Sequence, residues 1–222
     1  MLSTTPRTTL GREKHRASTD RADLYDVLDT GLICHLGVVH DGHPMVVPTG
    51  YGRIGDTLYL HGSTGARSLR SGQDTEICVT VTHVDGIVLA RSVFNHSFNY
   101  RSAMIYGTAR LVTDQEERLE GLRALTEHLA PGQWDYARRP SRKELAATSV
   151  LALDLTEASV KLRTGPPNDE DTDYALPIWA GVLPLATTFG TPVPDPVLPP
   201  ATPPPPHIQT RHTSPTNTPE TP

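Results

Sequence analysis

The segment from Pro44 to Arg70, PMVVPTGYGRIGDTLYLHGSTGARSLR, contains residue types that could bind a phosphate. His61 ends an apolar run, residues 62–65 are small, and the short predicted helix that follows carries Arg70. Small residues at a helix start leave backbone N–H groups free, and a guanidinium one turn further on adds a charge-assisted donor. The spacing matches neither the Walker P-loop nor the dinucleotide fingerprint. An ordinary polar helix cap is the alternative interpretation.

Antiparallel strands are expected to position these residues. The predicted strands cover residues 32–40, 44–53 and 57–61, and a helix is predicted over 63–71. Asp41-Gly42 and Gly55-Asp56 lie between consecutive strands, and both dipeptides are typical of tight hairpin turns. His61 therefore lies at a strand end, where sites often form; a histidine bonded only to backbone is the alternative.

The rest of the chain continues this pattern. Asp20 offers an N-cap to a helix that Gly31 ends, and Thr113 to Glu116 form a capping box for a second helix that ends at Pro131-Gly132. Further strands are predicted over 77–81, 87–89, 100–112 and 148–161, with Asp85-Gly86 as the turn between the first two. The pattern predicts a mainly β fold, a mostly antiparallel barrel with helices at its ends.

Composition separates a core from its two ends. The chain has 222 residues and 21 prolines, of which twelve fall within residues 191–222. Such a segment buries too little apolar surface to offset its ordering entropy. We therefore expect a disordered N-terminus over 1–11, one domain over 12–186, and a Pro-rich disordered tail over 187–222 that is either inert or a ligand for a partner domain.

Charge and cysteine use exclude several classes of protein. The net charge of −5, with both signs interspersed, argues against a nucleic-acid surface. No apolar run is long enough for a membrane span, and the N-terminus has no apolar core of a secretory signal. Cys34 and Cys78 lie in apolar runs and indicate reduced thiols in a cytoplasmic protein.

Two other chemistries find little support in the spacing. On an alternating strand His35 and His40 face opposite sides, and a turn separates His40 from His43, so no metal site is expected. A hydrolase triad is also disfavoured, because no GxSxG elbow is present.

The hairpin segment resembles the pyridoxamine 5'-phosphate oxidase-like flavoproteins, in the branch that includes nitroimidazole-resistance and flavin-nucleotide-binding proteins. Three more segments share the resemblance, which covers about residues 12–186: GLICHLGVVHDGHPMVVP at 31–48, FNYRSAMIYGTARLVTD at 98–114 and WAGVLPL at 179–185. The resemblance implies an antiparallel split β-barrel with peripheral helices that binds FMN.

The resemblance also implies roles for particular residues. Arg67 matches the family's basic residue at the phosphate, although Ala66 stands where relatives often have a second basic residue. Residues 47–49 match the strand that passes the flavin ring, and 100–102 match a strand that covers the cofactor, often across a dimer interface. His61 is the candidate catalytic residue. The candidate cofactor-binding residues are Val47, Pro48, Thr49, His61, Gly62, Ser63, Thr64, Gly65, Arg67, Arg70, Tyr100, Arg101, Ser102 and Trp179, the last of which could instead fill a hole in the core.

The expected function is that of an FMN-dependent oxidoreductase acting on a small cyclic or nitroaromatic substrate, as a homodimer without nucleic-acid or membrane partners. The alternative is a non-catalytic protein that holds a flavin, F420 or haem. A true pyridoxamine 5'-phosphate oxidase is disfavoured, because that activity needs basic residues near the C-terminus, where this chain is acidic and then proline-rich.

Overall fold

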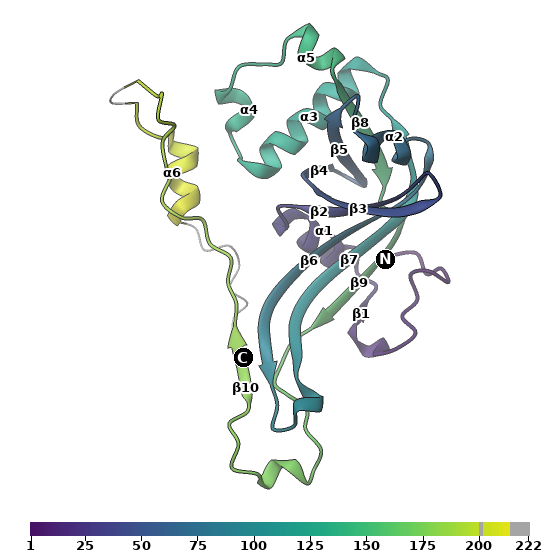
Figure 1. Ribbon diagram of the computed structural model, residues 1–222, viewed down its shortest axis with the longest axis vertical. Helices are drawn as coiled ribbons and strands as arrows, with labels where there is room; N and C mark the ends of the chain where they lie inside the picture. Colours follow the sequence, from purple (N-terminus) through teal and green to yellow (C-terminus); the bar gives the residue numbers. More distant parts are fainter. Residues whose placement is uncertain (200–201, 214–222) are drawn as a thin grey trace.

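The computed structural model describes residues 1–199 and 202–213 of the chain. In this part ten strands form one antiparallel sheet, whose main path runs β3-β2-β6-β7-β8-β5-β4 (Figure 1). The strands are β1 (Ala17–Ser18), β2 (Cys34–His40), β3 (His43–Thr49), β4 (Tyr51–Ile54), β5 (Thr57–Ser63), β6 (Thr75–Leu89), β7 (Ser97–Leu111), β8 (Thr148–Asp154), β9 (Glu157–Arg163) and β10 (Gly181–Pro184). The α-helices are α1 (Arg21–Thr30), α2 (Arg67–Gly72), α3 (Gln115–Leu129), α4 (Gln133–Tyr136), α5 (Arg142–Ala146) and α6 (Pro206–Thr213).

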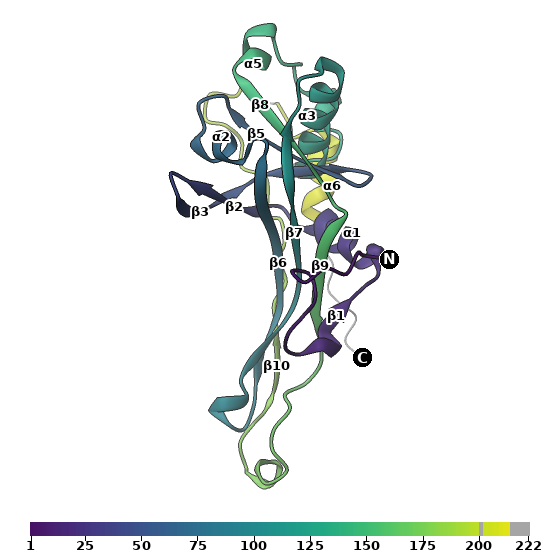
Figure 2. The ribbon, with the colours of Figure 1, turned by 90° about the vertical axis from the view of Figure 1, so that its right-hand side faces the viewer.

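The two long strands β6 and β7 divide the molecule into a barrel and a stalk. β6 pairs with β2 through residues 78–80 and with β10 through 86–89. β7 pairs with β8 through 110–111 and with β9 through 100–106. β6 and β7 therefore each change their pairing partner along their length. This change of partners gives the barrel its split form. The far halves of β6 and β7, with β10 and residues 164–180, extend from the body as the stalk (Figures 1 and 2). The expected antiparallel split barrel with peripheral helices is confirmed.

Strand alternation distributes the apolar side chains over two clusters. Leu58 and Leu60 on β5 point into the barrel, where they join the main core beneath α1. Tyr59 points the opposite way and packs with Leu125 of α3 in a second, smaller cluster. Because the side-chain period of a strand is two, His61 falls on the same face as Tyr59.

Local signals in the sequence explain where most of the helices and strands begin and end. Asp20 caps α1 by accepting a hydrogen bond from the backbone N–H of Ala22 at 2.9 Å. Asp41 and Gly42, with φ of 50° and 77°, make the turn between β2 and β3. The cap of α3 is Asp114, one residue after the predicted start of the capping box, and its carboxylate accepts from the N–H of Glu117 at 2.8 Å.

Three strand predictions differ from the structure. The predicted strand 44–53 is divided at Gly50 into β3, which pairs with β2, and β4, which pairs with β5. The predicted strands 77–81 and 87–89 are one continuous β6, because Asp85-Gly86 forms a bulge in the ladder rather than a turn. The predicted strand 148–161 is divided into β8 and β9. Asp154 accepts a hydrogen bond from the N–H of Thr156 at 2.6 Å and so turns the chain between them.

Both ends of the chain lie against the body in the structure. Leu2 is only 6% exposed, and Arg7 forms ion pairs with Glu76 and Glu157. At the other end, residues 185–199 and 202–213 form the C-terminal arm, which rises from β10 to α6 (Figure 1). The disorder expected over 1–11 and 187–222 stays a prediction, and residues 200–201 and 214–222 lie outside the described part. None of the described helices has the length and apolar character needed to cross a bilayer.

Candidate functional site

The junction of β5 and α2 is built as a tight loop. The N–H of Gly65 donates to Oγ of Ser63 at 3.2 Å, and the N–H of Thr64 donates to the carbonyl of Ala147 at 3.0 Å. The N–H of Ala66 donates to the carbonyl of Ser63 at 2.8 Å. These bonds hold the loop in place, but they occupy N–H groups that the sequence pattern offered to a phosphate. The donors that remain for an anion are chiefly side chains.

Arg67 and Arg70 supply those donors. Both side chains are exposed on α2, and neither guanidinium has an ion pair or hydrogen bond to any residue in the described part of the chain. An unpaired guanidinium can offer a bidentate, charge-assisted contact to a phosphate. Gly62 lies beneath them, where an added Cβ would come within 2.8 Å of Leu69, so the strand passes close to the helix.

The strand β3 borders the same region. It pairs only with β2 among the described strands, so its outer edge is free of strand pairing. Val47 and Ala66 both pack against the main core, and α2 packs on β2, the strand that pairs with β3 (Figures 1 and 2). Pro48 is exposed and Thr49 half-buried on this edge. The structure thus brings together two groups of predicted residues, 47–49 and 61–70.

His61 opens onto a hollow on the other face of β5. Leu122 and Thr126 of α3, Trp134 of α4, and residues 137–140 of the following loop line this hollow. The imidazole is exposed at the opening and forms no hydrogen bond with a described residue. Partial burial among these side chains lowers its pKa below the usual value, so the ring is neutral at pH 7.

Two arginines form the rim of the His61 hollow. Arg138 pairs with Glu144 at 2.7 Å, and Arg139 pairs with Asp135 at 2.7 Å. The guanidinium of Arg139 also lies 4.8 Å from the ring centroid of Trp134. These residues were not among those predicted from the sequence. The run QWDYARRP, which places a tryptophan and two arginines directly after the predicted helix end, could have indicated them.

The predicted residues on β7 lie elsewhere. Arg101 is held by Asp85 and Asp26, and it lines a hollow that includes His83 and the start of the C-terminal arm. Ser102 shares a 3.0 Å hydrogen bond with Thr82 on β6, and Tyr100 stands opposite Arg163 on β9. These three residues border the stalk side of the sheet.

Trp179 also lies apart from the α2 region. Its side chain is 68% exposed in the stalk, directly before β10, and it packs against Gly181. In this chain it neither fills the core nor shares a lined hollow with His61 or α2 in the described residues.

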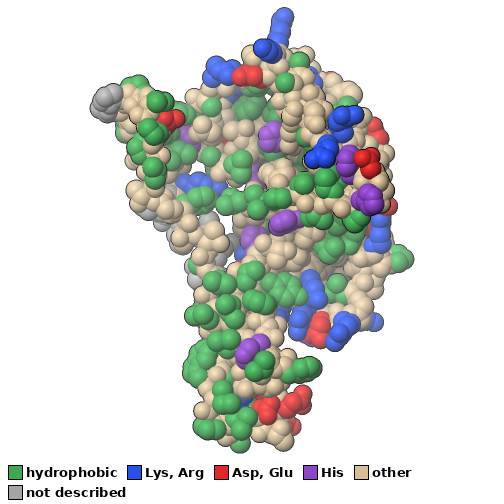
Figure 3. Space-filling model, viewed as in Figure 1, with side chains coloured by type: hydrophobic (Ala, Val, Ile, Leu, Met, Phe, Trp, Pro, Cys, Tyr) green, Lys and Arg blue, Asp and Glu red, His purple; other side chains and the backbone are tan. Residues whose placement is uncertain are grey.

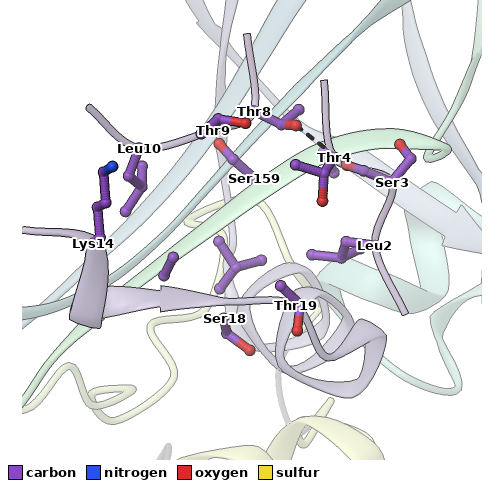
Figure 4. Close-up of a pocket in the computed structure, with 13 residues that line it drawn as sticks. Leu2, Ser3, Thr4, Thr8, Thr9, Leu10, Lys14, Ser18, Thr19 and Ser159 are labelled. Carbon is purple, nitrogen blue, oxygen red and sulfur yellow. Dashed lines mark hydrogen bonds between the residues drawn. The ribbon is translucent and has the colours of Figure 1, made fainter. Parts of the chain in front are cut away.

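A further small hollow of about 180 Å³ lies under the N-terminal segment (Figure 4). Its walls are mostly hydroxyl side chains, and Oγ1 of Thr8 donates to the carbonyl of Ser3 at 3.2 Å, so its polar groups serve the segment's own fold. Within the described residues no group of three or more His, Cys, Asp or Glu side chains is arranged to hold a metal ion.

The antiparallel split barrel is the fold that the resemblance to the pyridoxamine 5'-phosphate oxidase-like proteins implies. The family model described as pyridoxamine 5'-phosphate oxidase matches residues 20–162, and the chain belongs to this family. None of the curated proteins matches the sequence.

Two solved structures resemble nearly the whole chain. The flavocytochrome Anf3 from Azotobacter vinelandii is 39% identical, with a TM-score of 0.90 over 95% of this chain and 99% of its own. The FAD and haem binding protein from Mycobacterium smegmatis is 44% identical, with a TM-score of 0.85 over 89% and 97%. A 5-nitroimidazole antibiotic resistance protein from Bacteroides thetaiotaomicron, 22% identical with a TM-score of 0.56 over 65% and 85%, shares the fold.

Proposed function

We propose that this protein binds a flavin nucleotide at the edge of β3 and transfers electrons to or from a small molecule. The observation that carries the proposal is the position of Arg67 and Arg70. Both guanidinium groups are free of carboxylates in the described residues, and they lie on a helix beside the open edge of β3. A flavin phosphate on these arginines would leave the ring along Val47 to Thr49. A bound flavin supplies one- and two-electron redox chemistry, and the protein positions it.

The nucleotide is FMN, or the FMN half of FAD. The family resemblance implies FMN, whereas the similar protein from Mycobacterium smegmatis is described as binding FAD and haem. Both cofactors present the same flavin ring and first phosphate to the protein. The contacts proposed for β3 and α2 therefore serve either one.

A haem is the second part of the proposal, and the His61 hollow fits it. The neutral imidazole of His61 has both nitrogens free of hydrogen bonds to described residues, so one of them could bind the iron. Leu122 and Trp134 would provide apolar walls for a porphyrin, and Arg138 and Arg139, paired with Glu144 and Asp135, lie at the rim of the hollow, where propionates would have to compete with those carboxylates. A bound haem would supply one-electron chemistry at this position. His61 would then be an iron ligand rather than a group that touches the substrate.

We further propose that the protein is a homodimer in the cytoplasm. The stalk exposes Val93, Phe94 and Trp179, which are 85%, 93% and 68% exposed, and exposed apolar groups of this kind mark interfaces. Carboxylates gather near the tip of the stalk, and basic groups near α5 at the opposite end (Figure 3). Two antiparallel copies would bring these charges together. The substrate class that we propose is a small cyclic or nitroaromatic compound.

The absorption spectrum of the purified protein tests both cofactors. We expect flavin bands together with a Soret band, and release of the flavin by denaturation identifies it as FMN or FAD by chromatography. The variant His61→Ala should lose the Soret band and keep the flavin bands. The control His15→Ala removes an exposed histidine far along the chain and should keep both. A colourless protein contradicts the whole proposal, and a Soret band that survives in His61→Ala moves the haem elsewhere.

A further inference from the structure

The C-terminal arm and the body enclose a space of ligand size. Two adjoining hollows of about 520 and 440 Å³ share Thr30, Leu32 and Phe189 in their walls, and together we name them the arm hollow. Small-molecule sites in proteins have volumes of roughly 300–1,000 Å³. The body contributes one wall from α1, α3 and β6, and the arm contributes the other.

Most of the walls are apolar. The apolar side chains that line the arm hollow are Leu32, Ile33, Val84, Pro131, Leu185, Ala186 and Phe189. Phe189 belongs to the arm and lies where the two hollows meet. An aromatic ring in this position favours a flat apolar ligand, because offset stacking adds to the burial of its surface.

The carboxylates of the arm hollow already have partners. Glu127 accepts hydrogen bonds from the N–H groups of Gly132 at 2.7 Å and Trp134 at 2.8 Å. Asp29 accepts from Arg53 at 2.8 Å, and Asp85 is paired with Arg101 at 3.1 Å. Asp29 and Asp85 are thus each paired with an arginine, whereas Glu127 is held by backbone N–H groups and keeps its negative charge.

Arg211 of α6 is the cation without a partner. Its Nε atom is buried and has no hydrogen bond to any residue among 1–199 and 202–213, and its guanidinium lies 4.4 Å from the ring centroid of Phe189. Arg211 is half-buried, and a buried guanidinium nitrogen without a hydrogen-bond partner is costly, so this group favours an anion.

The histidines of the arm hollow do not change this charge balance. Nε2 of His83 lies 3.0 Å from the carbonyl of Val27, and Nε2 of His128 lies 2.5 Å from the carbonyl of Gly31. Nε2 of His207 lies 2.9 Å from the side-chain carbonyl oxygen of Gln133. A carbonyl only accepts, so each Nε2 carries a proton and donates it to that oxygen. Arg211 therefore remains a cation without an ion pair to any described residue, next to an aromatic ring.

We propose that the arm hollow is a binding site for a planar aromatic carboxylate, with its ring against Phe189 and Leu32 and its carboxylate on the guanidinium of Arg211. The site adjoins the proposed flavin surface. Ile33 in its wall precedes Cys34, which pairs with Thr49 at the end of β3. A ligand in the arm hollow would thus lie near the flavin ring, although its binding does not depend on the flavin.

Calorimetric titration of the full chain, as purified, with 2-naphthoate tests the proposal. The neutral 2-naphthamide is the matched probe, since it has the same ring without the charge. We expect wild-type protein to bind naphthoate more tightly than naphthamide. Arg211→Gln should weaken naphthoate at least tenfold, which is about 1.4 kcal/mol, and change naphthamide by less than threefold. Arg142→Gln, an exposed arginine on α5, should change neither.

The aromatic contact needs its own variant. Phe189→Ala should weaken both probes by a similar factor, whereas Phe94→Ala, which removes an equally large but 93% exposed ring in the stalk, should weaken neither. Unchanged melting temperatures show that the variants remain folded. The proposal is overturned when wild-type protein does not bind naphthoate, or when Arg211→Gln weakens naphthoate and naphthamide equally.

Discussion

The guanidinium of Arg101 donates two hydrogen bonds, each 3.1 Å long, to the carboxylate of Asp85 on the neighbouring strand. Asp85 is the extra residue in the β6 ladder, because Val84 pairs with Tyr100 and Gly86 with Asn99. The pair therefore lies at the bulge, and it occupies an arginine that the family resemblance placed among the cofactor-binding residues.

We expect Arg101→Ala to lower the free energy of unfolding by about 2–3 kcal/mol. The side chains of Arg101 and Asp85 are only 18% and 11% exposed, so the variant leaves a partly buried carboxylate without its partner. Chemical denaturation measures this change. Arg142→Ala, an exposed arginine on α5, is the control and should stay within about 0.5 kcal/mol of wild type.

The double variant Arg101→Ala/Asp85→Asn separates this pair from general packing. Asp85→Asn removes the charge that Arg101→Ala leaves unpaired, so the two changes together should cost less than the sum of the two single changes. Additive losses would show that the pair is not coupled, and that Arg101 stabilises the fold through other contacts.

A different arginine is expected to serve the flavin phosphate. Arg67→Ala should weaken FMN binding by about ten- to a hundredfold, because one charge-assisted hydrogen bond contributes about 1.5–3 kcal/mol. Riboflavin lacks the phosphate, so its affinity should hardly change. Fluorescence titration of apoprotein with both ligands measures the difference, with Arg123→Ala on α3 as the control. Equal losses for FMN and riboflavin would place the phosphate elsewhere, first at Arg70.

The fold was largely predictable because its signals are local. Asp41-Gly42, Gly55-Asp56 and the cap at Asp20 each act within a few residues, and the structure uses all three where the pattern indicates. The failure at Asp85-Gly86 has a tertiary cause. The same dipeptide makes a turn or a bulge, and here a long-range ion pair to Arg101 favours the bulge.

The site was predictable only in part, for the same reason. Residues 47–49 and 61–70 lie within a single stretch of hairpin and helix, so their proximity follows from their closeness in the sequence. The hollow beside His61 instead depends on α3 and α4, more than sixty positions further along. Arg138 became a candidate only when the packing showed which face of β5 His61 occupies. Arg211 became a candidate only when the structure showed which cations have no partner among the described residues.

The burial of His128 should make stability depend on pH. Burial lowers the pKa of its imidazole, although the hydrogen bond to the Gly31 carbonyl partly opposes this effect. Above about pH 6.5 both the folded and the unfolded chain hold a neutral ring, so His128 adds no pH dependence there. As the pH falls below this value, the unfolded chain takes up a proton that the folded protein resists, and stability decreases.

Denaturation curves at pH 7.5 and pH 5.5 check this prediction. The loss of stability between the two values should be smaller for His128→Gln than for wild type, because glutamine does not titrate. His15→Gln, which changes an exposed histidine, should follow the wild-type curve. An unchanged slope in His128→Gln would assign the pH dependence to other groups, and His61, whose pKa is also lowered by burial, would be the next to test.

The N-terminal segment offers a test in which the sequence and the structure make opposite predictions. Composition predicts that residues 1–11 are disordered, whereas in the structure Leu2 is 6% exposed within the main core and its N–H donates to the carbonyl of Thr19 at 2.8 Å. If Leu2 is buried in solution as it is in the structure, Leu2→Ala should lower the free energy of unfolding by about 1–2 kcal/mol, because it removes buried apolar surface near a chain end. Leu198→Ala, at 41% exposure, is the matched control and should have little effect. Chemical denaturation measures both variants. If Leu2→Ala is as stable as wild type, the segment is disordered in solution, as the composition predicts.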